Sequence, residues 1–191
     1  FDKPDPLDGP FFEETIFITP SRLPGPVQEE LIGITDRAVA ALGLKEGPVH
    51  VELRVNDEAV WIIEVNPRSI GGLCSRVLRF GVGMSLEELI IRQALGQDTG
   101  AIERQGRPAG VMMIPVPRAG ILEEVRGVTA AEAVEGVEKV TISAHPGQEL
   151  VPLPEGSPYP GFIFARGPTP EIVETALREA HGHLEFIIRS P

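Results

Sequence analysis

The sequence has few of the features that mark membrane, secreted or nucleic-acid-binding proteins. Its single cysteine, Cys74, excludes an intramolecular disulfide and a thiolate zinc site, and we expect a reduced, cytoplasmic protein. No run reaches the roughly 18 consecutive apolar residues of a transmembrane helix. Acidic residues outnumber basic ones by 28 to 17, and the resulting net charge of −11 argues against binding to nucleic acid or to an anionic membrane.

The residues that are present indicate a folded protein of modest size. Hydrophobic residues make up 42% of the 191 positions and charged residues 24%, which is enough to build a sizeable core. The length fits one ordinary domain or slightly more. Residues 1–5 contain neither an initiator methionine nor the pattern of a signal peptide, so we expect the chain to be a piece of a longer protein.

The order of the expected elements indicates an α+β fold in two parts. A strand-like run covers 14–19, and apolar spacing predicts a helix opened by Pro26 and closed at Gly43. A second helix begins at the capping box formed by Ser85 and Glu88. The polar connector at 97–108 suggests a boundary between an antiparallel sheet with helices in 1–107 and a small α+β sandwich, one sheet backed by two helices, in 108–191. The sandwich is expected to contain strands at 110–117, 120–126, 138–144, 160–166 and 184–188, and helices at 129–135 and 170–182.

Two strands in the first part are expected to form a hairpin around a three-residue turn at 56–58. The hydrophobic residues set its register, which pairs Val55 with Ala59, Leu53 with Trp61, Val51 with Ile63 and Val49 with Val65. One face is then wholly apolar, and Trp61 belongs to the core. The other face carries His50, Glu52, Ile62, Glu64 and Asn66. In this register the two glutamates are diagonal neighbours across the hairpin, about 7–8 Å apart from backbone to backbone.

The paired acids predict a divalent cation. Two carboxylates on one face repel each other, and a bound cation removes the conflict. Carboxylate and amide oxygens from Glu52, Glu64 and Asn66 suit Mg²⁺ or Mn²⁺, and Mg²⁺ is usually held by one or two carboxylates together with substrate phosphates. The alternative is a solvated strand face whose acids have no ligand. His50 shares this face and is interpreted as an ordinary polar strand residue.

The segment after the hairpin offers groups that bind anions. Arg68 follows Glu64 by four residues, and its planar guanidinium can clamp a phosphate or carboxylate at two points. Gly71 and Gly72 then lead into an expected helical stretch whose backbone N–H groups suit an anion. A cation site, an arginine and a helix start together predict a site for a polyphosphate or an acyl phosphate.

The strings Gly47–Leu53 and Trp61–Arg68 resemble the C-terminal core of the ATP-grasp superfamily. The resemblance implies that Glu52, Glu64 and Asn66 hold magnesium on ATP and that Arg68 contacts the phosphates or the acyl-phosphate intermediate. It also implies that Gly71 lies where a loop N–H approaches that intermediate. The later segment 111–165 looks like the C-terminal domain of L-amino-acid ligases. By this resemblance, 1–107 is the C-terminal portion of an ATP-grasp catalytic domain and 108–191 is a small C-terminal domain.

The resemblance implies an ATP- and Mg²⁺-dependent carboxylate-amine ligase that forms an amide or peptide bond through an acyl phosphate. Its partners would be a small-molecule carboxylate, an amine, and the N-terminal and lid domains of the same chain. Nothing in the sequence corresponds to those domains, so the piece is expected to be inactive alone. Two alternatives stay open. One is a carboxylase of the biotin-carboxylase or purine-pathway type, and the other is a non-catalytic binding or homodimerisation module.

Overall fold

The computed structural model describes residues 1–5, 15–56, 58–100, 102–104, 106–156 and 159–190. The chain divides into two compact units. The first, here called the sheet unit, consists of Phe1–Ser21 and Arg107–Pro191, and the second, the hairpin unit, is Arg22–Gly106. None of the helices in the described part of the chain has the length and hydropathy of a membrane-spanning segment.

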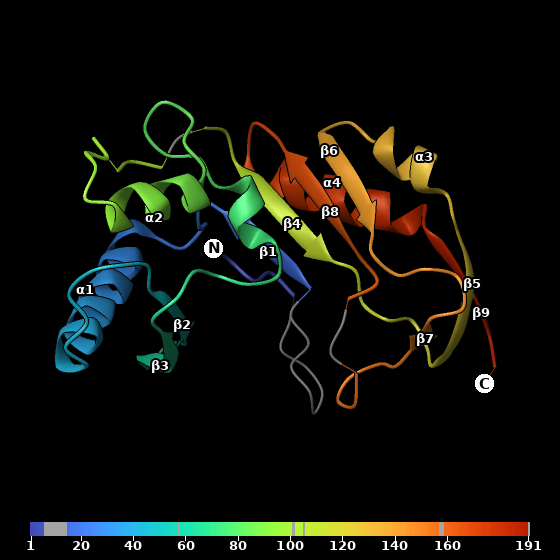
Figure 1. Cartoon of the computed structure of the whole chain (residues 1–191), viewed down its shortest axis with the longest axis horizontal. Coiled ribbons are helices and arrows are strands. Elements are labelled where there is room, and N and C mark those ends of the chain that lie inside the picture. The colour runs from blue at the N-terminus through green and yellow to red at the C-terminus, as the bar shows by residue number, and fades with distance from the viewer. Residues whose placement is uncertain (6–14, 57, 101, 105, 157–158, 191) are drawn as a thin grey trace. The chain divides into compact units, whose positions relative to one another are not determined.

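The sheet unit is built on a four-stranded antiparallel sheet with two helices. The strand order is β1 (Ile16–Thr19), β4 (Ala109–Met113), β8 (Gly161–Arg166) and β6 (Val137–Ile142). The helices α3 (Val128–Glu132) and α4 (Pro170–Gly182) pack on this sheet, and Figure 1 shows α4 running behind it. The strand-like run expected at 14–19 is therefore present as β1 from Ile16 onward, while Thr15 precedes the strand and Glu14 lies outside the described residues.

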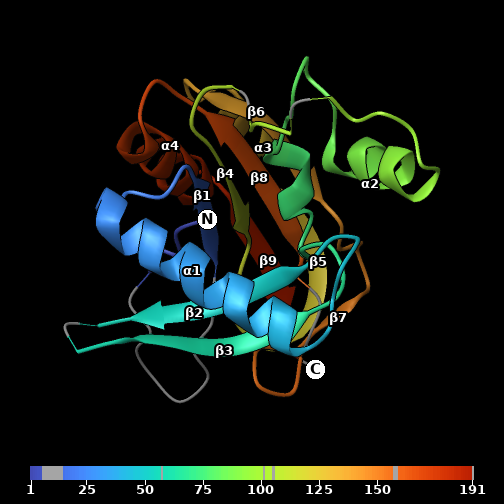
Figure 2. The ribbon, with the colours of Figure 1, turned by 90° about the vertical axis from the view of Figure 1, so that its left-hand side faces the viewer.

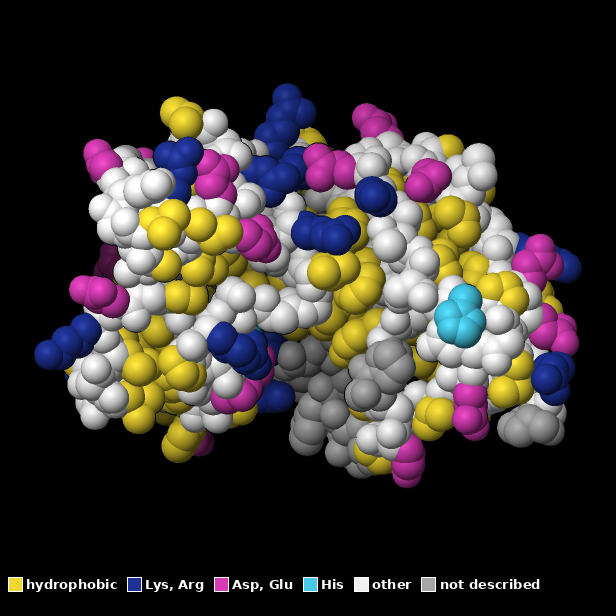
Figure 3. Space-filling model, in the orientation of Figure 1, with side chains coloured by type: hydrophobic (Ala, Val, Ile, Leu, Met, Phe, Trp, Pro, Cys, Tyr) yellow, Lys and Arg dark blue, Asp and Glu magenta, His cyan; other side chains and the backbone are white. Residues whose placement is uncertain are grey.

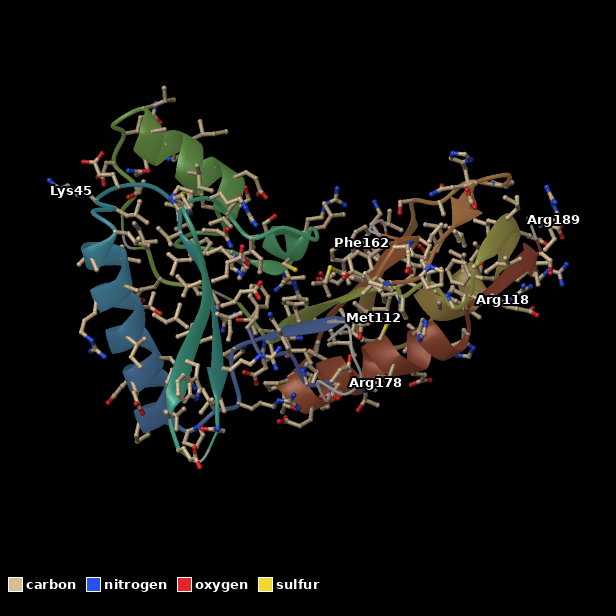
Figure 4. All side chains as sticks on the ribbon, turned by 90° about the horizontal axis from the view of Figure 1, so that it is seen from below. Lys45, Met112, Arg118, Phe162, Arg178 and Arg189 are labelled. Carbon is tan, nitrogen blue, oxygen red and sulfur yellow. The ribbon has the colours of Figure 1, made fainter. Side chains whose placement is uncertain are left out.

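A second, three-stranded sheet corrects the expectation of a single sheet in this unit. Its order is β7 (Glu149–Leu150), β5 (Gly120–Arg126) and β9 (Glu185–Arg189), and β7 was not expected at all. Leu122, Leu150 and Ile188 form a small core of their own on these strands. The sequence did not reveal this division because alternation identifies a strand but not its pairing partner. Arg118 and Arg189 lie at this end of the unit (Figure 4), where a guanidinium N–H of Arg118 donates to the carbonyl oxygen of Ile188.

The main core of the sheet unit lies between the four-stranded sheet and α4. Gly110 on β4 faces the helix so closely that a Cβ there would lie 2.9 Å from Val173 and 3.0 Å from Leu177, both fully buried. The side chain of Thr169 caps the helix by accepting from the backbone N–H of Ile172. Arg178 on the outer face pairs with Glu174 and, at 2.6 Å, with Asp5 (Figure 4). These ion pairs raise the pKa of the Arg178 guanidinium.

His181, in the last turn of α4, has a lowered pKa, because partial burial removes water from the imidazole and disfavours its charged form. His181 is half-buried, whereas neighbouring His183 is exposed. Since the folded state resists protonation, the unfolded chain takes up the proton first as the pH falls below about 6.5. The free energy of unfolding therefore decreases over that range.

We expect this decrease to be smaller in His181→Gln than in the wild type when urea unfolding is measured between about pH 7 and pH 5. His183→Gln is the matched control and keeps the wild-type slope. Equal slopes in the wild type and in His181→Gln would contradict the assignment.

The hairpin unit contains α1 (Gly25–Ala41), the strands β2 (His50–Val55) and β3 (Val60–Asn66), the short 3₁₀ helix η1 (Cys74–Val77) and α2 (Leu86–Ala94). The helix α1 has proline in its first turn, as the sequence predicts. It lies along the two-stranded hairpin of β2 and β3 (Figure 2). At the start of α2, the Ser85 hydroxyl accepts from the backbone N–H of Glu88 at 3.1 Å, which confirms the predicted cap.

The hairpin unit exposes most of the large apolar side chains that reach solvent. No residue of α1 is buried. In the sheet unit, Phe1 and Ile172 are the only exposed large apolar side chains among the described residues. Figure 3 shows apolar surface over the region of α1 and α2. The exposed members in the hairpin unit are Leu23, Ile32, Leu42, Val55, Trp61, Ile62, Ile63, Val82, Ile91, Leu95 and Ile102.

Candidate active site on the hairpin

The hairpin of β2 and β3 has a different register from the expected one. Val55 pairs with Val60, so that 56–59 connect the strands, and Asp57 in this connection lies outside the described residues. The Asn56 side chain accepts from the backbone N–H groups of Glu58 and Ala59, which stabilises the longer turn. A β-bulge then shifts the register between Glu52 and Leu53. The expected register assumed a three-residue turn and an unbroken ladder, and neither holds.

The bulge places the two glutamates directly opposite each other. Glu52 pairs with Glu64, and next to them His50 pairs with Asn66. Direct partners share a face and have their Cβ atoms about 4.5–5.5 Å apart, which is closer than the diagonal arrangement expected. The expectation that the two acids share a face is thus confirmed, and the register that was used to reach it is wrong. Bulges frequently re-aim side chains next to functional sites.

The longer turn also brings Trp61 onto the face of the acids, because the pairs between the turn and the bulge follow the turn. Trp61 is the direct partner of Arg54, which alternates with Glu52 on the same side of β2. Its side chain is 55% exposed, so its expected place in the core is wrong. Ile62, which was expected on the face of the acids, instead pairs with Leu53 on the apolar face. No signal in the sequence marks a bulge at this position.

The carboxylates differ in their surroundings. The side chain of Glu52 is 24% exposed, and its Oε1 lies 3.7 Å from Nε2 of His50, whose side chain is 16% exposed. Glu64 is exposed. The Nδ2 atom of Asn66 is buried and has no hydrogen-bond partner among the described residues. Since the terminal amide torsion is broad, this side chain can turn its oxygen toward a ligand on the face of the acids.

The donor set fits a magnesium or manganese ion bound together with phosphates. No group of three or more His, Cys, Asp or Glu side chains that could hold a metal occurs in the part of the chain that the structure describes. Two carboxylates and an amide oxygen are therefore an incomplete shell for a hard divalent cation. Mg²⁺ commonly completes such a shell with water and substrate phosphate oxygens.

The loop after β3 presents Arg68 to solvent. Its backbone N–H donates to the carbonyl oxygen of Asn66 at 2.8 Å, and its Nη1 donates to the carbonyl oxygen of Ser69 at 3.0 Å. A Cβ on Gly71 would have no atom within 4 Å, so the backbone there is open to a ligand. The loop thus keeps an accessible guanidinium and a bare backbone close to the strand that carries Glu64.

The expected helical stretch after Gly72 is only η1, four residues long, and does not supply the helix N-terminus that the sequence suggested. Gly72 and Leu73 both have left-handed backbone angles, with φ of 60° and 56°. Leucine rarely adopts this conformation, and such strain is concentrated at functional sites. No sequence pattern indicated this conformation at Leu73. Cys74, which follows, is buried.

The far end of this loop is anchored to α2. Glu87, in the first turn of α2, has a lowered pKa, chiefly because the Ser75 hydroxyl on η1 hydrogen-bonds to its carboxylate. The Ser85 hydroxyl and the nearby Arg79 contribute in the same direction. These contacts hold η1 against α2.

Two family models match successive parts of the chain. Residues 1–77, which include the hairpin and the Arg68 loop, match the ATP-grasp domain. Residues 112–189 match the L-amino acid ligase C-terminal domain 2. The chain belongs to the ATP-grasp superfamily. This ATP-grasp protein has the same arrangement of antiparallel sheets and helices as its relatives of known structure.

The solved structures that resemble this ATP-grasp chain include an L-amino acid ligase from Bacillus licheniformis. It is 31% identical, with a TM-score of 0.83 over 95% of this chain and 46% of that protein. Phosphoribosylglycinamide synthetase from Anaerococcus prevotii is 17% identical, with a TM-score of 0.75 over 92% of this chain and 46% of that one. The biotin carboxylase domain of Hydrogenobacter thermophilus 2-oxoglutarate carboxylase, solved with MgADP and bicarbonate, is 18% identical, with a TM-score of 0.66 over 92% and 40%. The last two likenesses concern the fold alone.

A curated relative, the protein y4rH of Sinorhizobium fredii, is 27% identical over 169 residues. The match covers 88% of this chain and 35% of that protein. The chain therefore spans between about a third and a half of the length of these relatives.

Proposed function

We propose that the chain is part of an ATP- and Mg²⁺-dependent carboxylate-amine ligase that joins a small carboxylic acid to an amine. The observation that carries the proposal is the direct pairing of Glu52 with Glu64, followed by Asn66 and the exposed Arg68. In such a reaction the carboxylate attacks the γ-phosphoryl group of ATP, which gives an acyl phosphate and ADP. The amine then displaces phosphate and forms the amide or peptide bond.

Different residues of this chain would bind the metal ion and contact the phosphates. Glu52, Glu64 and Asn66 would hold Mg²⁺ or Mn²⁺, which neutralises phosphate charge when bound. Arg68 would be the catalytic residue that clamps the transferring phosphoryl oxygens or the acyl phosphate, since its guanidinium is exposed. The backbone N–H of Gly71 would approach the same oxygens across the open space beside it.

The rest of the ATP site would come from other parts of a longer chain. We propose that 1–107 form the C-terminal portion of the ATP-grasp catalytic domain and that 108–191 form its small C-terminal domain. The exposed apolar side chains of the hairpin unit support a missing partner domain, because large exposed apolar surfaces usually contact other protein. The piece alone would then lack the groups that hold adenine and would not turn over.

A ligase is favoured over a carboxylase by the identity and length of the matches. The L-amino acid ligase C-terminal model covers 112–189, and the 31% identity to a ligase extends over 95% of the chain. The likeness to the carboxylase domain, at 18% identity, supports the fold only. A purely structural or dimerisation module would also not require two acids that face each other on the hairpin.

Binding of a metal–nucleotide complex tests the proposal in the full-length protein. We expect Mn²⁺ with ADP, at about 100 times its Kd, to stabilise the folded state by about 2.7 kcal/mol, because a ligand specific for the native state shifts the equilibrium toward it. The stabilisation is measured by calorimetry as a rise in Tm. Glu52→Gln should abolish the shift. Glu58→Gln, a change in the exposed turn of the same hairpin, should keep it. A wild type that does not respond to Mn²⁺–ADP would overturn the metal site.

A further inference from the structure

His50 is a polar residue of the acid face to which the proposed reaction gives no role. It lies at the start of β2, two residues before Glu52, so both side chains point to the same side of the strand. Its cross-strand partner is Asn66, another of the proposed metal ligands. One side chain therefore borders two of the three ligands.

The contact between His50 and Glu52 has the form of a ligand and its orienting partner. Nε2 of His50 lies 3.7 Å from Oε1 of Glu52, within ion-pair range. Both side chains are mostly covered, with 16% and 24% of their surfaces exposed, so solvent screens the contact less than it would on an open strand. Glu64, across the hairpin, is exposed instead. Of the two carboxylates, Glu52 is thus the one that protein groups can hold in place before a metal arrives.

We propose that His50 is a positioning residue for the metal site, which directs its Nε2–H toward the carboxylate of Glu52 and fixes the orientation of that ligand. The inference rests on the proposed function and adds to it a residue that does not touch the metal. Groups that hydrogen-bond to metal ligands set their orientation, and removing such a group typically weakens metal affinity 10–100-fold.

Mn²⁺ affinity separates this role from simple packing. In the full-length protein with ADP present, the Kd for Mn²⁺ is measured by EPR of the free ion at fixed pH. His50→Leu, which keeps bulk but has no donor, should weaken binding about 10–100-fold. His50→Gln, whose amide N–H reaches about the position of Nε2, should bind within about threefold of the wild type. His183→Gln, in the sheet unit, is a matched control that should have no effect.

The possible outcomes distinguish His50 from the site itself. Glu64→Gln should lose Mn²⁺ binding, and if it does not, the proposed metal site fails together with this inference. If Glu64→Gln loses binding while His50→Leu retains wild-type affinity, only the role of His50 is overturned. Equal losses in His50→Leu and His50→Gln would also overturn it, because they would indicate packing or shape rather than a donated hydrogen.

A spectroscopic measurement tests direct ligation. We expect pulsed EPR of the bound Mn²⁺ to show no directly coordinated nitrogen that depends on His50. A nitrogen coupling that is present in the wild type and absent from His50→Gln would make His50 a metal ligand and would overturn the positioning role.

Discussion

Replacing Glu64 with alanine in the full-length protein is expected to abolish ATP-dependent formation of ADP, to below about a thousandth of the wild-type rate. Glu64 is the direct partner of Glu52, and without it the remaining acid and Asn66 are too few to hold a cation on the phosphates. Loss of a group that stabilises charge in the transition state costs about 10²–10³ in rate, and loss of the ion itself should cost more. The measurement is ADP release in the presence of Mg²⁺, ATP and a mixture of amino acids.

The matched control for this experiment is Glu58→Ala. Glu58 lies in the exposed turn of the same hairpin, and only its backbone N–H takes part in the described turn, through the Asn56 side chain. This variant should keep wild-type turnover and an unchanged circular dichroism spectrum. If Glu64→Ala retained most of its turnover, the metal assignment would have to be withdrawn.

Replacing Gly127 with alanine is expected to lower the free energy of unfolding by about 2–4 kcal/mol. Gly127 precedes α3 with φ of 80°, where a side chain is strained. A Cβ there would lie 1.8 Å from the carbonyl oxygen of His183, which is backbone and cannot move aside cheaply. The strain and the clash add, and urea unfolding followed by circular dichroism would measure their sum.

Gly182→Ala is the matched control in the same unit. Gly182 is the last residue of α4, has no left-handed backbone angle, and has no atom within 4 Å of the position that a Cβ would take. Alanine favours a helix over glycine by up to about 1 kcal/mol, so this variant should be neutral or slightly more stable. Similar stabilities for Gly127→Ala and Gly182→Ala would show that the close approach at Gly127 is relieved at little cost.

Local signals in the sequence predicted most of the secondary structure. The spacing of apolar residues and the proline in the first turn placed α1, and Ser85 with Glu88 placed the start of α2. These features act within one or two turns of the chain, so a sequence is enough to find them. The two-residue strand β7 was missed because so short a pairing leaves no periodic pattern.

The site was predictable in its residue types but not in its arrangement. Glu52 and Glu64 were expected on one face, and they are on one face, yet they are direct partners where a diagonal was expected. The error follows from the longer turn together with the bulge between Glu52 and Leu53, and the longer turn also moved Trp61 from the expected core to the acid face. The functional roles of Glu52, Glu64, Asn66, Arg68 and Gly71, and the cytoplasmic location, stay predictions.

By itself the sequence determined the two acids, the amide and the arginine, and the alternating strands that bring them to one hairpin. Side-chain chemistry and the two-residue period of a strand are local properties, and they follow directly from residue order. Only the tertiary structure decided the register of the hairpin, the left-handed backbone at Leu73 and the division of the later strands into two sheets. These depend on which strands and turns pack best together, a comparison of long-range contacts that no single segment of the chain contains.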